Sequence, residues 1–191
     1  MRHFPTLGAA MLLLATGAPA TRAHAQGAPP RAATPADGFT IHVTAPHMVQ
    51  GHEMGPVHHY CKPISPEPVI QCLLYDTAGA NAPLTGIEYI IAKSITRPLV
   101  TLGTWNANFH DHALEIATGR VKVLDMPADE ARKVAELVAT TDGIVFHLWP
   151  IGDRIPTGTV EIAQSVGHRP ITAEEYARSE RARSDRAPKD R

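Results

Sequence analysis

Hydrophobic and polar residues alternate along several stretches of the chain or gather there in short apolar runs. Alternation is the period of a β-strand, because successive side chains of a strand point to opposite faces. The stretches are 39–43, 57–62, 69–76, 86–95, 110–117, 120–124, 144–149 and 160–163. Turn-forming residues separate neighbouring stretches, such as the prolines of 63–68 and the pair Thr118-Gly119. The pattern therefore predicts hairpins and a mainly antiparallel sheet.

The stretch 125–143 carries the signals of a helix instead. Pro127 and the two acids that follow it suit the first turn of a helix, and residues 140–143 end it. Between them, apolar residues recur at helical spacing, at Val134, Leu137 and Val138. We therefore predict a single α+β domain, a mainly antiparallel β-sheet with one main helix at about 127–140.

Two further segments show neither the alternation of a strand nor the apolar spacing of a helix. Pro46 and Gly51 interrupt the segment 46–56, which is predicted to be a loop. The segment 97–103 is predicted to be an irregular crossing between strands.

The first 25 residues have the composition of a cleaved export leader. A basic start at Arg2 precedes an apolar run over 7–15 and a small-x-small site at 23–25. The apolar run is shorter than the roughly 20 residues of a membrane-spanning helix, so no transmembrane segment is predicted, and an uncleaved anchor is the alternative. We expect a signal peptide at 1–25 and a periplasmic or secreted protein after cleavage near Ala25.

The rest of the chain divides by composition. A small, Pro-rich segment at 26–38 predicts a flexible linker, the domain occupies 39–168, and 169–191 is a polar, charged tail. Because Arg2 and Arg22 belong to the leader, the 18 basic and 19 acidic residues of the chain become 16 and 19, a net charge of −3. With no basic stripe in addition, nucleic acid is not expected as a partner.

His110 and His112 are the first candidates for chemistry. On a strand their side chains share one face, so the two imidazoles can hold a metal ion together. Glu115 falls on the opposite face of such a strand and joins them only if a bulge re-aims it. The alternative is a pair of structural histidines that are hydrogen-bonded to the backbone.

A segment rich in His and Met, 47–59, could supply further ligands. Imidazoles and soft thioethers favour copper, and a loop of solvent-exposed histidines is the alternative. We expect one polar site around a divalent metal or copper ion, with imidazoles from His110, His112 and one of His58 or His59.

Cys61 and Cys72 lie on the two arms of the hairpin predicted for 57–62 and 69–76, where they can meet. In an exported protein this favours a disulfide. Two alternatives stay open, namely a metal centre that includes His59 and a pair of buried free thiols.

Glu88 stands within the apolar stretch 86–95. A buried carboxylate needs a partner or a ligand, and the alternative is a position at the wetter end of the strand. If a metal-bound water acts as a nucleophile, Glu88 or Glu115 is the candidate base.

Several blocks stand in a set order along the chain: His58-His59-Tyr60-Cys61, Gln71-Cys72-Leu73-Leu74-Tyr75-Asp76, Gly86-Ile87-Glu88-Tyr89-Ile90-Ile91, Trp105 and His110-x-His112-x-x-Glu115. Over roughly 57–160 this order and spacing resemble the oil body-associated protein family of plants, fungi and bacteria. The resemblance implies an uncharacterised domain, linked in plants to seed lipid droplets, with no established reaction and no assigned catalytic residues. It adds a lipid surface to the expected partners, and the leader suggests an exported, bacterial-type member.

Three functions follow from these observations. The first is a binding protein for a metal or a small molecule that uses the clustered histidines. The others are a metal-dependent hydrolase and a lipid-associated structural protein without catalysis. The sequence has no Gly-x-Ser-x-Gly, no phosphate loop and no dinucleotide fingerprint. No established motif therefore decides whether the protein is an enzyme.

Overall fold

The computed structural model of the protein describes residues 34–150 and 153–184. The leader expected at 1–25 lies outside these residues, as do most of the linker expected at 26–38 and the last residues of the expected tail.

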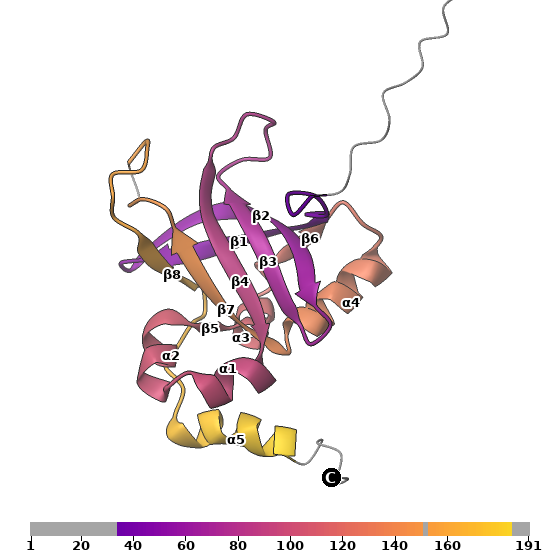
Figure 1. The fold of residues 1–191 in the computed structure, drawn as a ribbon, viewed down its shortest axis with the longest axis vertical. Helices are drawn as coiled ribbons and strands as arrows, with labels where there is room; N and C mark the ends of the chain where they lie inside the picture. Colours follow the sequence, from indigo (N-terminus) through magenta and orange to yellow (C-terminus); the bar gives the residue numbers. More distant parts are fainter. Residues whose placement is uncertain (1–33, 151–152, 185–191) are drawn as a thin grey trace, which may run out of the picture. The chain divides into compact units, whose positions relative to one another are not determined.

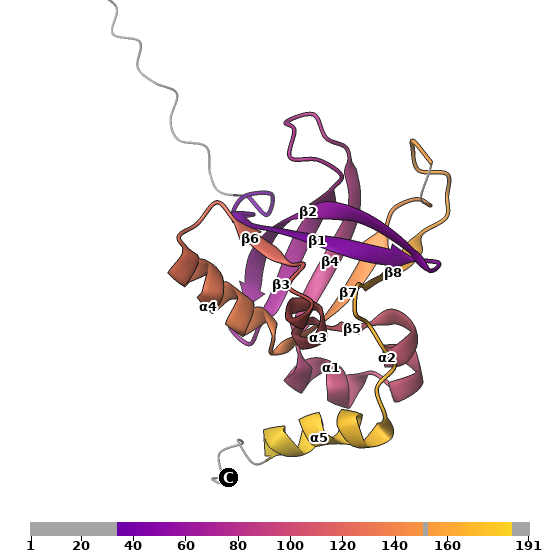
Figure 2. The ribbon, with the colours of Figure 1, turned by 180° about the vertical axis from the view of Figure 1, so that it is seen from behind.

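Within the described residues, six strands close into an antiparallel barrel (Figure 1; Figure 2). Each strand pairs with the next in the order β2-β3-β4-β7-β8-β1, and β1 then pairs with β2. The six strands are β1 (Ile41–Val49), β2 (His52–Ser65), β3 (Val69–Tyr75), β4 (Leu84–Ala92), β7 (Thr141–His147) and β8 (Glu161–Ser165). Two short strands, β5 (His110–Asp111) and β6 (Lys122–Leu124), pair with β7 and β1.

The hairpin of β1 and β2 closes the barrel. Gln50 and Gly51 form its two-residue turn and both have positive φ, the backbone that a tight hairpin turn requires. Pro46 sits where the register shifts between Ala45 and His47, so it interrupts no regular ladder. The loop predicted for 46–56 is therefore wrong, because a bulge accommodates Pro46 and a tight turn accommodates Gly51.

The predicted α+β fold, a sheet with one main helix, is also wrong. The protein is mainly β, a closed barrel that carries several short helices. Alternation shows which side chains share a face, and an open sheet and a barrel alternate in the same way. Closure here depends on the 14-residue strand β2, which pairs with β1 through 52–61 and with β3 through 58–65.

Three helices lie together beyond one end of the barrel in both views (Figure 1; Figure 2). They are α1 (Lys93–Leu99), α2 (Leu102–Asn108) and α5 (Ala173–Ser184). Trp105, Phe109 and Ile171 form an apolar cluster here, against which Tyr176 of α5 packs. The segment 97–103, predicted to be irregular, contains the end of α1 and the start of α2. The remaining helices are α3 (His112–Ala117) and α4 (Ala128–Val138), and α4 lies within the range predicted for the main helix.

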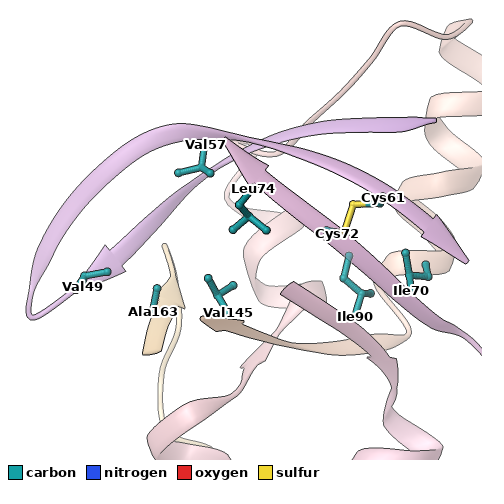
Figure 3. Packing of buried hydrophobic residues seen from close by; sticks show 9 residues of the cluster. All are labelled: Val49, Val57, Cys61, Ile70, Cys72, Leu74, Ile90, Val145 and Ala163. Atoms are coloured by element: carbon teal, nitrogen blue, oxygen red, sulfur yellow. A yellow bond between two sulfur atoms is a disulfide. The ribbon is translucent and has the colours of Figure 1, made fainter. Parts of the chain in front are cut away.

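Aliphatic side chains and a disulfide form the apolar core of the barrel (Figure 3). A disulfide joins Cys61 of β2 to Cys72 of β3, which face each other in the register of the two strands. The other buried members are Val49, Val57, Ile70, Leu74, Ile90, Val145 and Ala163.

Removing the disulfide should lower the free energy of unfolding by about 3 kcal/mol, because the bond restricts a loop of this length in the unfolded chain. The two cysteines are 11 residues apart. Urea unfolding of the wild type should shift to lower urea in reductant, whereas the double variant Cys61→Ala, Cys72→Ala should unfold alike with and without it. Two titratable thiols in the denatured, unreduced wild type would contradict the pairing.

Candidate metal centre

Glu88, His110 and His112 bring three ligand atoms together. Glu88 Oε1 lies 3.2 Å from His112 Nε2 and 3.3 Å from His110 Nε2, and the two nitrogens are 3.3 Å apart. The three residues are 3%, 1% and 3% exposed, in chain order. Carboxylate oxygens and imidazole nitrogens are common ligands of divalent transition metals. This cluster could therefore hold a metal ion.

The chain changes from strand to helix between the two histidines. β5 ends at Asp111, whose carboxylate accepts a hydrogen bond from the Ala113 amide (2.8 Å) and so caps α3. Glu115 stands one helical turn after His112 and places Oε2 3.9 Å from Nε2 of both histidines. The strand predicted for 110–117 is therefore wrong beyond Asp111. The helix directs Glu115 toward the histidines. On the predicted strand, only a bulge could have done so.

Glu88 belongs to a belt of paired residues that runs around most of the barrel. Cys61 pairs with Cys72, Cys72 with Glu88, Glu88 with Val145, and Val145 with Ala163. Residues that pair directly share a face of the sheet, and all five are buried. Glu88 is the charged member of this belt, so its carboxylate depends on partners rather than on solvent.

Gly143 makes room for the centre. It lies in β7 between Ile90 of β4 and His110 of β5. A Cβ at this position would lie 2.3 Å from His110 Nε2 and 2.6 Å from Glu88 Oε1. The sequence pattern placed Gly143 only at the end of a helix. The sequence signal for this role is a glycine at the start of an apolar strand, because such a glycine often marks a place where other groups approach the backbone closely.

Thr141 fixes which nitrogen of His112 carries a proton. Its hydroxyl donates to the carbonyl of Val138 (2.6 Å), so its oxygen accepts from His112 Nδ1 (2.9 Å). In the neutral ring, Nε2 then turns a lone pair toward the carboxylate of Glu88. A proton or a metal ion between the two groups removes this repulsion, and a second hydrogen bond of this kind is typical of metal-binding histidines.

Charge pairing affects the pKa values of Glu88 and His112 more than burial does. Burial alone would raise the pKa of Glu88, but hydrogen bonds from His110 and His112 hold that pKa well below its ordinary value. Burial alone would lower the pKa of His112, but the hydrogen bond to Glu88 raises that pKa. The centre therefore favours an ionised carboxylate with a positive charge beside it.

A chain of histidines crosses the interior next to the centre. His59 Nδ1 donates to the carbonyl of Val57 (3.0 Å), so a neutral His59 accepts at Nε2 from His47 (2.9 Å), which in turn accepts from His147 (3.0 Å). Burial, and then neighbouring His59, lower the pKa of His47 well below its ordinary value. His59 Nε2 also lies 3.5 Å from Glu88. His59 thus adjoins the centre, but its lone pair serves His47.

His58 lies apart from the centre. Its Nδ1 is 2.9 Å from His42 Nε2, and His42 Nδ1 is 2.6 Å from Asp125. Partial burial, and then the charge of His42, lower the pKa of His58. Of the ligands predicted from the sequence, the structure brings together His110, His112 and Glu115, places His59 beside them and leaves His58 elsewhere.

A buried ion pair anchors the elements that carry the centre. Arg97 of α1 donates two hydrogen bonds of 2.7 Å to Asp142 of β7, and these side chains are 3% and 0% exposed. Arg97 also reaches Asp111 (3.3 Å), which Lys93 contacts at 2.6 Å. Asp111 precedes His112 and Asp142 precedes Gly143, so this network fixes β5 and β7 where they meet the centre.

A small cavity of about 40 Å³ opens beside the centre. Four of its lining residues are polar, namely His59, Glu88, His112 and Glu115. The others are apolar and come from the barrel, from α3 and α4 and from the segment around β6; they include Val43, Ala45, Ile90, Val123, Ala135 and Val138.

The family follows from a comparison with known families. The family described as "Protein of unknown function (DUF1264)" matches residues 33–189. The chain belongs to this family. The resemblance of the chain to the oil body-associated protein family is confirmed at the level of the family, since relatives of that name are also found.

These relatives are plant proteins. The chain is 34% identical to oil body-associated protein 1B of Arabidopsis thaliana over 113 residues, which are 57% of the chain and 45% of the relative. It is also 34% identical to oil body-associated protein 1A of Zea mays over 109 residues, 55% of the chain and 44% of the relative. The chain thus spans less than half the length of these relatives. No solved structure matches it.

The relatives overturn the predicted periplasmic or secreted location, because they are named for oil bodies and not for export. That prediction depended on the composition of residues 1–25 alone. No helix within 34–150 and 153–184 is long and apolar enough to cross a membrane.

Removing one partner of the buried ion pair should be costly. Arg97→Met leaves Asp142 without its main counter-ion, and the expected loss in the free energy of unfolding is about 3–5 kcal/mol. The double variant Arg97→Met, Asp142→Asn removes both charges and should recover part of this loss in urea unfolding. A double variant that loses as much as the two single variants together would show that the charges do not stabilise each other.

Proposed function

We propose that the protein binds a divalent transition-metal ion through Glu88, His110 and His112. The triangle of ligand atoms with sides of 3.2–3.3 Å carries this proposal. The hydrogen bond between His112 Nδ1 and Thr141 supports it, because it leaves Nε2 free to bind a metal. Since the ligands are nitrogen and oxygen without sulfur, a divalent ion of intermediate softness suits them better than the cuprous ion.

Gly143 supports the same proposal. Its missing side chain leaves the space that His110 Nε2 and Glu88 Oε1 occupy. Glycine in a strand weakens packing, and here the space that it leaves is taken up by one imidazole and one carboxylate of the centre. A site of this kind is better explained by a bound cation than by core packing alone.

Metal binding can be measured on chelator-treated protein by titration calorimetry with Zn²⁺, with elemental analysis after dialysis. We expect one ion per chain in the wild type and loss of binding in Glu88→Gln and His112→Ala. Thr141→Val, which removes only the supporting hydrogen bond, should weaken binding about 10–100-fold.

Two matched controls accompany these variants. His52→Ala removes an exposed histidine and should leave the affinity unchanged. Gly143→Ala should abolish binding, whereas Gly103→Ala, whose Cβ meets no atom within 4 Å, should not. Zn²⁺ binding that survives His112→Ala in protein with wild-type circular dichroism would exclude the proposed centre.

Association with a lipid surface is the second candidate function, and the comparisons favour it over metal binding. The relatives carry names that link them to oil bodies. The segment between β7 and β8 offers an apolar contact, since Ile155 is 67% exposed and Val160 56% exposed. This role requires no catalysis and is compatible with a metal in the interior.

Flotation with a phospholipid-coated triacylglycerol emulsion tests this role. The wild type should float with the oil, and the double variant Ile155→Ser, Val160→Ser should float several-fold less, because it loses the exposed apolar side chains. Leu99→Ser is the matched control, as Leu99 is 79% exposed but lies on α1. Wild-type protein that stays in the aqueous layer would rule out this role.

A further inference from the structure

We propose that the metal centre holds ferrous iron and binds a neutral diatomic ligand of the size of dioxygen in the adjoining cavity. This inference rests on the proposed metal site and adds the class of metal and ligand. Two histidines and one carboxylate on one face of an ion, with other positions open, are typical of non-haem Fe(II) sites that react with dioxygen.

The distances fit three ligands on one face of an ion. The atoms of Glu88, His110 and His112 form a triangle with sides of 3.2, 3.3 and 3.3 Å. An ion about 2.1 Å from each atom, the usual metal–imidazole distance, lies about 0.9 Å out of their plane. All three ligands then occupy one side. Glu115 Oε2 is 3.9 Å from both nitrogens, so it stands next to this set without belonging to the triangle.

A cavity adjoins the centre. Glu88 and His112 belong both to the triangle and to the lining of this cavity, most of which is aliphatic. Its volume of about 40 Å³ is room for roughly three water-sized spheres. Away from the centre its lining is aliphatic, which suits a small apolar molecule. A diatomic gas matches the size of the cavity and this aliphatic part of its lining.

The same cavity does not suit hydrolysis. An ester or amide with its substituents is larger than the cavity of about 40 Å³. Beyond the four polar residues at the centre, the lining is made of aliphatic side chains and Cys61, whose sulfur is in the disulfide. The lining therefore favours a small neutral ligand over a polar substrate.

Nitric oxide, a stable stand-in for dioxygen, provides the test. Chelator-treated protein is loaded with Fe(II) without air, iron is counted by elemental analysis, and nitric oxide is added. We expect one iron per chain and the half-integer-spin electron paramagnetic resonance signal of a ferrous–nitrosyl species. Glu88→Gln and His112→Ala should lose both the iron and the signal.

A variant that fills the cavity distinguishes binding of the ligand from binding of the metal. Ala135→Leu on α4 adds bulk to the lining and should keep the iron while the signal falls at least tenfold. Ala131→Leu, on the same helix but outside the lining, should keep both. Iron without a signal in the wild type, an undiminished signal in Ala135→Leu, or binding of Zn²⁺ but not Fe(II) would overturn this inference alone. Failure to bind any divalent metal would overturn the proposed function and this inference with it.

Discussion

The charge of Glu88 is the constraint on which the arrangement of the other elements depends. Its carboxylate lies in a belt of buried residues that is otherwise apolar, and an ionised carboxylate away from water is strongly destabilising unless partners surround it. Its main partners lie outside the six barrel strands, His110 on β5 and His112 on α3. The packing of β5 and α3 against the barrel therefore supplies the charge compensation that the barrel strands lack.

Three consecutive residues at the start of β7 connect this centre to its surroundings, each by a different kind of interaction. Thr141 orients the ring of His112, Asp142 binds Arg97 of α1, and Gly143 leaves space for the ligand atoms. Because they are adjacent in one strand, a shift of β7 along its neighbours would disturb all three interactions at once. The register of β7 against β4 and β5 is thus tied to the polar interior as well as to the apolar core.

The sequence predicted most strands and the position of α4, because hydrophobic period and helix-start signals are local. It also put His110 and His112 together and placed Cys61 opposite Cys72, since both pairs depend only on short spacing. Closure of the barrel could not be predicted, because it requires β8, near the end of the described chain, to pair with β1 at its start.

The components of the centre were harder to predict for a similar reason. Glu88 and Gly143 meet the histidines through long-range pairing, and the switch from β5 to α3 depends on the cap at Asp111. The alternation of apolar and polar residues continues beyond Asp111, so the sequence pattern predicted Glu115 on the wrong face.

Closure of the sheet also affects how the protein meets other copies of itself. An open sheet ends in strands whose unpaired N–H and C=O groups offer a template for edge-to-edge aggregation. In the described part of the chain, each barrel strand has a paired neighbour on both sides, although the ends of the long strand β2, at 52–57 and 62–65, pair on one side. The strands that pair on one side only, β5 and β6, have two and three residues. Such short edges give a neighbouring molecule little backbone on which to add a strand.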